Sequence, residues 1–263
     1  MSYKTLQVQE TDDVITVTMN RPERRNALNP EGIDDLLRAL DETGKRSSGV
    51  MILTGAGESF CAGLDLDHLQ ALNSKSPAEH REDSARIAQL FRTLYDLPLP
   101  TIAAVNGAAI AGGMGLATIC DFTLAVPEAK FGFTEVRIGF IPAIVSSFLL
   151  QQIGEKQARD LLLSGRLIKA PEAKQIGLVN EVVEDTVLMP RARELAQSLL
   201  QNSPESLRAT KKLLSSHAKD QLDRELQFAV ECNATARSTG DFYEGIAAFL
   251  EKRTPKWPSR KKG

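Results

Sequence analysis

The sequence has few cysteines, no excess of charge of either sign and no long apolar run. Its three cysteines, Cys61, Cys120 and Cys232, are odd in number and far apart, which excludes a disulfide framework and a zinc-ligand spacing. We therefore expect reduced thiols and a cytoplasmic protein. The formal net charge of −2 gives no overall basic field, so nucleic acid is not an expected partner. No apolar run approaches the length of a membrane span and the first residues carry no targeting signal, so no membrane is expected either.

The order of apolar segments predicts an α/β protein. Short strands at 3–9, 14–19, 50–54, 101–105 and 122–126 alternate with helical segments at 31–43 and 84–94, which favours parallel pairing. From Pro204 onward the pattern is helical, over 206–215, 221–234 and 241–251. We predict a core over 1–195 and a C-terminal helical region over 196–263. The polar stretch 72–82 is expected to be a mobile loop.

Two glycine-containing turns are the most informative local feature. SFCAGLDLD at 59–67 and NGAAIAGGMGL at 106–116 each follow an apolar strand. Glycine allows close backbone approach and positive φ, so two such turns side by side can direct two peptide N–H groups at one point. That arrangement is an oxyanion hole, which stabilises negative charge on a carbonyl oxygen. Either turn alone would be interpreted as a tight connector.

Several segments resemble the crotonase superfamily, the enoyl-CoA hydratase/isomerase family. The matching segments are NRPERRNAL at 20–28, the two turns at 59–67 and 106–121, FGFTEVRIGFIPA at 131–143, SGRLIKAPEAKQIGLVNEVV at 164–183 and IAAFLEKR at 246–253. They span essentially the whole chain in family order. The resemblance implies a spiral of ββα turns with two roughly perpendicular sheets, and C-terminal helices that trimerise, with trimers often paired into hexamers. It also implies an acyl-CoA thioester substrate, with no metal and no redox cofactor.

The resemblance assigns roles to individual residues. The oxyanion-hole donors would be the backbone N–H groups of Leu64 and Gly112, and Glu135 would exchange a proton with the substrate carbon. Apolar neighbours of Glu135 favour a raised carboxyl pKa, which suits this task, although a glutamate at a helix N-terminus has a structural explanation as well. The residues implied in substrate and CoA binding are Arg24, Arg25, Ala27, Ala62, Gly63, Asp65, Leu66, Gly113, Gly115, Phe249 and Lys252. For the Asp65 side chain, helix capping is the simpler interpretation.

One departure from the family pattern narrows the function. Two-glutamate hydratases carry a first glutamate two residues after the paired glycines of the second turn, where this chain has Gly115. The EVRIGFIPA stretch at 135–143 resembles the methylglutaconyl-CoA hydratase-like group, whose members also have glycine there. We therefore expect an enzyme that adds or removes water across Cα=Cβ of a branched, carboxylated enoyl-CoA.

Two alternatives stay open from the sequence. A Δ3,Δ2-enoyl-CoA isomerase also works with a single glutamate. A non-catalytic CoA- or RNA-binding protein on the same fold would use the basic segment RTPKWPSRKKG at 253–263, although one aromatic and five basic residues are more typical of a solvated tail.

Overall fold

The computed structural model describes residues 2–260 and contains two β-sheets. The larger sheet has the strand order β1-β2-β3-β5-β7-β10, and the smaller one has the order β4-β6-β8-β9. The strands of the larger sheet are β1 (Leu6–Thr11), β2 (Val14–Met19), β3 (Val50–Gly55), β5 (Thr101–Val105), β7 (Phe122–Ala125) and β10 (Glu181–Val182). Those of the smaller sheet are β4 (Ser59–Cys61), β6 (Ala108–Ile110), β8 (Lys130–Gly132) and β9 (Ile168–Lys169).

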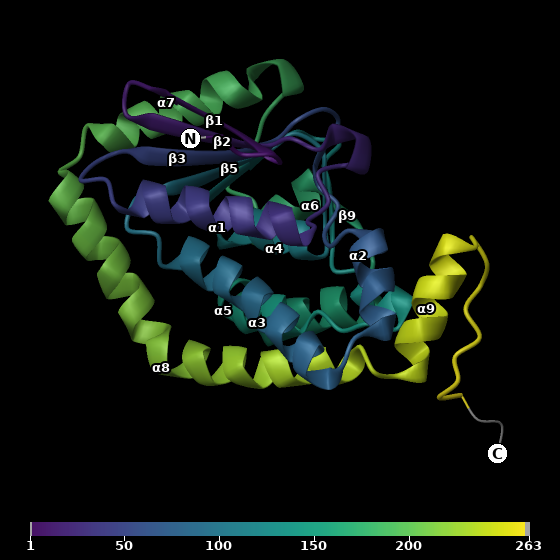
Figure 1. The fold of residues 1–263 in the computed structure, drawn as a ribbon. Coiled ribbons are helices and arrows are strands. Elements are labelled where there is room, and N and C mark those ends of the chain that lie inside the picture. Colours follow the sequence, from purple (N-terminus) through teal and green to yellow (C-terminus); the bar gives the residue numbers. More distant parts are fainter. Residues whose placement is uncertain (1, 261–263) are drawn as a thin grey trace.

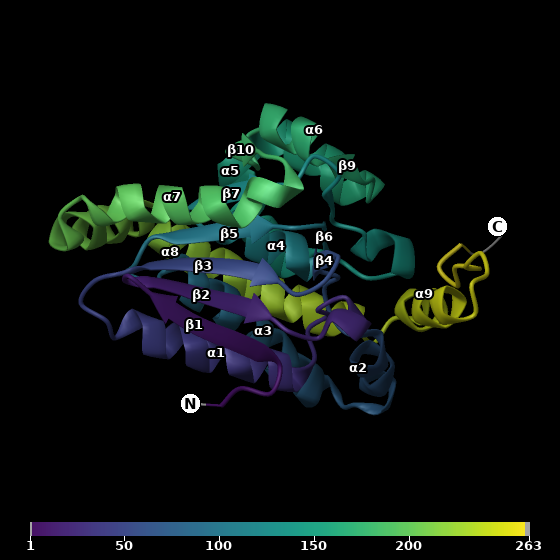
Figure 2. The same ribbon diagram turned by 90° about the horizontal axis from the view of Figure 1, so that it is seen from above.

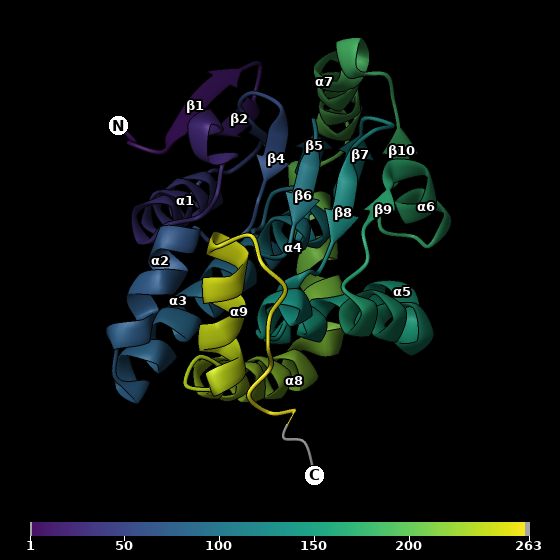
Figure 3. The same cartoon turned by 90° about the vertical axis from the view of Figure 1, so that its right-hand side faces the viewer.

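The chain passes between the two sheets in a repeating order. β3 leads to β4, β5 to β6 and β7 to β8, so each repeat contributes one strand to each sheet (Figure 3). Within this series neighbouring strands pair in parallel, whereas β1–β2 and β8–β9 are antiparallel. Every residue of β3 and β5 is buried, as expected for short apolar runs in a parallel sheet covered on both faces. The predicted α/β class is confirmed.

Helices cover both faces of the larger sheet. α7 lies along one face, and α1 and α4 lie on the other side (Figure 1; Figure 2 gives the view from above). The helices are α1 (Pro30–Gly44), α2 (Leu66–Ala71), α3 (Pro77–Tyr95), α4 (Gly112–Ile119), α5 (Ala143–Ser164), α6 (Ala170–Gln175), α7 (Leu188–Leu200), α8 (Pro204–Ala236) and α9 (Gly240–Leu250). Single 3₁₀ turns are η1 (Pro22–Arg24), η2 (Leu72–Ser74), η3 (Glu135–Ile138) and η4 (Asp185–Val187). No helix over residues 2–260 combines the length and apolarity needed to cross a bilayer.

The prediction of a mobile loop at 72–82 is wrong for most of that segment. α3 already begins at Pro77, where Ser76 and Glu79 form a reciprocal capping box. The Glu79 carboxylate accepts the Ser76 N–H at 2.8 Å, and the Ser76 hydroxyl accepts the Glu79 N–H at 3.3 Å. Polar composition suggested a loop, but the S-x-x-E spacing with proline at the first helical position is a helix-start signal.

The C-terminal helices pack on the body. α8 is one continuous helix instead of the two expected segments, and it packs against α3 and α5. Its buried residues Leu222, Leu226, Ala229 and Val230 belong to the main hydrophobic core. The predicted boundary at residue 195 lies inside α7, so the helical region shares the core of the α/β body. A trimerising role for these helices stays a prediction.

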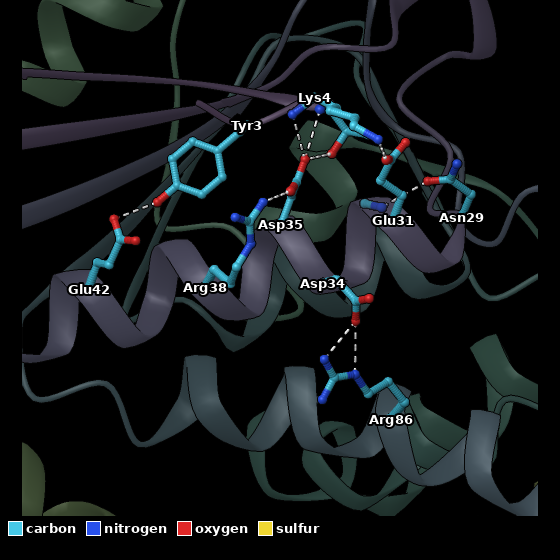
Figure 4. A network of polar contacts seen from close by, with 11 residues as sticks. Tyr3, Lys4, Asn29, Glu31, Asp34, Asp35, Arg38, Glu42 and Arg86 are labelled. Atoms are coloured by element: carbon cyan, nitrogen blue, oxygen red, sulfur yellow. Dashed lines mark hydrogen bonds and ion pairs between the residues drawn. The ribbon is translucent and has the colours of Figure 1, made fainter. Parts of the chain in front are cut away.

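A buried carboxylate attaches α1 to the start of the chain (Figure 4). The Asp35 carboxylate accepts hydrogen bonds from the backbone N–H groups of Lys4 and Thr5, both at 2.9 Å. It also forms an ion pair with Arg38. Burial raises the pKa of Asp35, but these hydrogen bonds lower it more, so that the net pKa lies below its usual range. The Thr5 carbonyl in turn accepts the N–H of Asn20 at 2.7 Å. Segment 20–29, which forms one wall of the cavity described next, is thereby fixed at both ends.

Candidate active site

A cavity of about 470 Å³ opens where the two glycine-containing turns, segment 20–28, η3 and α8 meet. Most of the predicted site residues line it, including both proposed N–H donors and the proposed proton carrier. Those that do are Arg24, Arg25, Ala27, Ala62, Leu64, Asp65, Leu66, Gly112, Glu135 and Phe249. Segments far apart in the sequence therefore form one site, as the resemblance implied.

The two turns pack against each other backbone to backbone. Gly63 has φ of 87°, and a Cβ atom there would lie 2.9 Å from the Ile110 carbonyl oxygen and 3.0 Å from Ala111 Cβ. A Cβ atom on Gly113 would lie 2.1 Å from the Cys61 carbonyl oxygen. Only glycine permits this approach at both places. Gly63 and Gly113 therefore support the walls of the site and do not line the cavity.

The Leu64 and Gly112 N–H groups are available to a ligand. The Leu28–Leu64 bridge uses the carbonyl of Gly63 and the N–H of Asp65, at 2.7 and 2.8 Å, which leaves the Leu64 N–H on the other side. Gly112 is the first residue of α4, so its N–H has no partner within the helix. Within residues 2–260, neither N–H donates to a backbone or side-chain acceptor outside regular helices and strands. Two free donors beside one cavity fit the requirement of an oxyanion hole.

The backbone of Ala111 is strained, and its conformation sets the direction of the Gly112 N–H. Its φ of 51° and ψ of −124° lie in a region that favours glycine. Such a conformation costs on the order of 1–3 kcal/mol and persists where the surrounding structure enforces it. The Ala111 N–H is held by the Gly132 carbonyl at 2.7 Å, and the peptide that follows presents the Gly112 N–H.

Glu135 is a buried carboxyl group of the site that has no ion-pair partner within residues 2–260. It opens η3 just after β8, is 8% exposed and has a pKa raised to about 7 because burial disfavours its charged form. Its Oε2 atom has no hydrogen-bond partner within the described residues 2–260. The main chain is fixed by a bond from the Phe140 N–H to the Glu135 carbonyl at 3.0 Å. A carboxyl with this pKa can accept and donate protons near neutral pH.

Charged residues at the mouth of the cavity are partly engaged within the chain. The Asp65 carboxylate accepts the Asp67 N–H at 3.0 Å as the N-cap of α2 and pairs with Arg21 at 3.0 Å. Its side chain is therefore structural, in agreement with the capping interpretation. Arg24 pairs with Asp67 at 2.9 Å, and both side chains are largely exposed. Such a pair contributes little to stability and leaves the guanidinium accessible to an anion.

Three further assignments have different outcomes. Phe249 of α9 lies at the cavity and is 55% exposed, whereas Lys252, which has φ of 53°, does not line it.

Gly115 does not line the cavity either, which corrects its assignment as a residue beside the substrate. A Cβ atom on Gly115 would lie 2.6 Å from Val145 Cγ1 and 3.1 Å from Phe91 Cε1. These two side chains occupy the space that the missing glutamate would need.

The sequence interpretation missed residues that α3 and α8 contribute. The lining side chains in this group are Ile87, Phe91 and Asn233. Asn233 carried a signal, because it is a polar residue on the helical face defined by Leu226, Ala229 and Val230. Its position at the cavity depends on how α8 packs, which periodicity does not give. The part of the chain that the structure describes contains no cluster of side chains suited to a metal ion.

The fold and the site define a class: an α/β spiral with two free N–H groups and one buried carboxyl free of an ion pair around an apolar cavity. The profile of the enoyl-CoA hydratase/isomerase family matches residues 9–260, and the chain belongs to this family, within the crotonase superfamily.

Curated relatives and solved structures agree with this membership. A Thermus thermophilus protein, provisionally named an enoyl-CoA hydratase, is 45% identical over 94% of this chain and 98% of its own length. The 2,3-dehydroadipyl-CoA hydratase of Escherichia coli is 34% identical over 96% of this chain and 98% of its own. The crystal structure of enoyl-CoA hydratase from Bacillus halodurans superposes with a TM-score of 0.88 at 27% identity, over 93% of this chain and 100% of that one.

Proposed function

We propose that this chain adds water to, or removes it from, the Cα=Cβ bond of an enoyl-CoA thioester. The observation that carries the proposal is the shared position of the Leu64 and Gly112 N–H groups and the Glu135 carboxyl at one cavity. The thioester oxygen would bind between the two N–H groups, and the acyl chain would extend along the apolar wall. Relatives named crotonyl-CoA hydratase and 2,3-dehydroadipyl-CoA hydratase support this reaction class.

In the proposed hydration, Glu135 acts first as a base. Its carboxylate accepts a proton from water as the water oxygen bonds to Cβ, and the π electrons move onto the thioester oxygen to give an enolate. The two N–H groups stabilise this enolate, each donor contributing typically about 3 kcal/mol. Glu135 then returns the proton to Cα, so one water is consumed and the carboxylate is regenerated. The reaction is redox-neutral, so the proposal requires no cofactor beyond the CoA of the substrate.

The acyl group is proposed to be branched and carboxylated, of the 3-methylglutaconyl type. Support comes from the EVRIGFIPA stretch at 135–143 and from the lack of a carboxylate at Gly115. Segment 20–28 and Phe249 would contact CoA. A cytoplasmic homotrimer or hexamer remains the expected form, and size-exclusion chromatography with light scattering would measure it.

Δ3,Δ2-Enoyl-CoA isomerisation is the second candidate. The observation that favours it concerns the two buried carboxyl groups that line the cavity. Asp65 is bound to Arg21, so Glu135 is the one that is free of an ion pair. One base can move a proton between C4 and C2 over the same enolate. A relative from Mycosarcoma maydis, 32% identical, is named an enoyl-CoA isomerase/hydratase.

Turnover on four thioesters distinguishes these reactions. Crotonyl-CoA, a 3-enoyl-CoA, 3-methylglutaconyl-CoA and 3-methylcrotonyl-CoA would be compared by steady-state kcat/KM. We expect the highest value for hydration of 3-methylglutaconyl-CoA. Faster conversion of the 3-enoyl-CoA would support the isomerase, and no turnover of any of them would contradict both candidates.

A further inference from the structure

Arg237 is a fully buried arginine that no step of the proposed reaction uses. It follows the last residue of α8 and is 0% exposed. Its Nη1 donates to Asp83 Oδ2 of α3 at 2.5 Å, whereas Nε and Nη2 have no acceptor among residues 2–260. Burying a cation with at least three of its five N–H donors unmatched is costly. A residue of this kind is therefore a candidate for binding a ligand.

The two free donors share one edge of the guanidinium. Nη1, which donates to Asp83, lies in the same plane but away from the edge formed by Nε and Nη2. The Nε–H and one Nη2–H therefore point in the same direction along that edge. This edge matches the spacing of the two oxygens of a carboxylate and binds it in a bidentate manner. The donor geometry thus favours a planar anion over a hydroxyl or a single carbonyl.

Arg237 lies directly behind the acyl wall of the cavity. Its Cζ atom is 5.6 Å from the centre of the Phe140 ring, and Phe140 lines the cavity. Asn233, one helical turn earlier on α8, lines the cavity as well and is 5% exposed. Since helical side chains lean toward the N-terminus, the Arg237 guanidinium lies on the same side of α8 as Asn233.

Adjacent residues of α3 hold both of these polar groups. Ser84 Oγ lies 2.8 Å from Asn233 Oδ1, and Asp83 binds Arg237 and also His68 Nε2 of α2, at 2.8 Å. With Oδ1 facing Ser84, the Asn233 amide donors have no acceptor among the described residues. The neighbouring wall is apolar, formed by side chains such as Ile87, Phe91 and Val145. Asn233 therefore places a polar side chain in an apolar wall, and Arg237 lies behind that wall at Phe140.

We propose that Arg237 and Asn233 form a receptor for a carboxylate on the acyl group, so that the preferred substrates are enoyl-CoA thioesters of dicarboxylic acids. The carboxylate oxygens bind Nε and Nη2 of Arg237, the Asn233 amide donates to one of them, and the Phe140 ring turns aside to admit them. This inference rests on the proposed function, because it takes the cavity as an acyl-CoA site.

Binding of two unreactive thioesters tests the receptor without depending on turnover. The pair is 3-methylglutaryl-CoA and 3-methylpentanoyl-CoA, which differ only by carboxylate against methyl at the end of the acyl chain. By isothermal titration calorimetry, we expect the wild-type protein to bind the carboxylated thioester about tenfold or more tightly. In Arg237→Met this ratio of dissociation constants should fall close to one, and in Arg237→Lys, which keeps charge but loses the fork, it should be intermediate.

Arg81→Met is the matched control. Arg81 of α3 forms an ion pair with Glu231 of α8 at 2.6 Å, but its side chain is 61% exposed. We expect the wild-type ratio in this variant. Because Arg237→Met leaves Asp83 with His68 but without its cationic partner, Asn233→Leu serves as a second variant that keeps the ion pair, and its ratio should also fall.

Each outcome decides the proposal. Equal binding of the two thioesters by the wild-type protein would overturn it, and so would a wild-type ratio in folded Arg237→Met, since an internal water could then satisfy the free edge. If Arg237→Met does not fold, an unchanged ratio in Asn233→Leu would overturn it instead. Failure of both thioesters to bind would contradict the proposed function, whereas equal binding would contradict the receptor alone.

Discussion

Gly63 and Ala111 touch where the two turns of the site meet. A Cβ atom on Gly63 would lie 3.0 Å from Ala111 Cβ, and the φ of 87° at Gly63 is one that side-chain-bearing residues rarely adopt. Because the residues that follow, Leu64 and Gly112, carry the two proposed N–H donors, this contact fixes the spacing of those donors. The oxyanion hole therefore depends on a glycine that does not itself line the cavity.

Gly63→Ala is expected to lower kcat by about 10²-fold or more, because separating the turns displaces one oxyanion donor. Steady-state turnover on the best substrate of the panel measures it. Gly57→Ala is the matched control, since Gly57 has φ of 72° and a Cβ atom there would lie 3.0 Å from Pro22 Cβ, outside the cavity lining. It should cost stability and leave kcat close to wild type. Equal effects of the two variants on kcat would contradict the role of Gly63.

Ala111→Gly is expected to stabilise the protein by about 1 kcal/mol, because glycine relieves the strain at φ of 51° and ψ of −124°. Urea unfolding measures the change in free energy. Ala108→Gly in β6 provides the contrast, since glycine within a strand should destabilise by roughly 0.5–1 kcal/mol. A loss of stability in Ala111→Gly of the same size would show that Ala111 is not strained.

Gly115→Glu is expected to destabilise the fold and to add no hydration of crotonyl-CoA. The new side chain would overlap Val145, whose Cγ1 lies 2.6 Å from the Cβ position, and overpacking of this kind costs typically about 1–3 kcal/mol. Adding Val145→Ala should recover part of the lost stability, which thermal unfolding of the single and double variants would measure. A stable single variant with raised crotonyl-CoA hydration would show instead that the site only lacks an acid.

The raised pKa of Glu135 predicts a pH dependence of stability with a defined sign. The carboxyl titrates at about 7 in the folded protein and at 4.5 when unperturbed, so the folded state holds its proton more tightly. Its contribution to the free energy of unfolding is fully present below pH 4.5 and is lost as the pH rises through about 7. The total loss is roughly 3 kcal/mol. Glu135→Gln does not titrate, so it should gain stability relative to wild type between pH 5 and pH 8. Unfolding curves that shift equally for both proteins over this range would contradict the burial of an ionisable Glu135.

The same carboxyl sets the expected rate profile. The proposed hydration starts from ionised Glu135, so kcat/KM should rise with pH through about 7 and then level off. A profile already flat from pH 5 upward would indicate that Glu135 is not the base.

The sequence predicts those features of the site that depend on residues close together in the chain, and not those that depend on the packing of distant segments. The two turns were recognisable because their chemistry depends on glycines within a few residues. The raised pKa of Glu135 followed from its apolar neighbours, whereas its catalytic role was implied by the family resemblance. The surroundings of Gly115 were not, since Phe91 comes from α3 and Val145 from α5. Likewise, Arg237 and Asn233 reach the acyl wall only through the packing of α8 on α3. The segment 77–82 has the polar composition typical of a loop, and only the capping spacing of Ser76 and Glu79 indicates that a helix starts there.

Glu135→Gln tests the central claim most directly, because it keeps the size of the side chain and removes the proton carrier. The measurement pairs steady-state turnover of the best enoyl-CoA with calorimetric binding of butyryl-CoA, a saturated thioester that cannot react. The account predicts a fall in kcat of roughly 10²–10⁴-fold with a dissociation constant close to that of wild type. A folded variant that retains turnover within a few-fold of wild type would contradict the assignment of Glu135 as the catalytic residue.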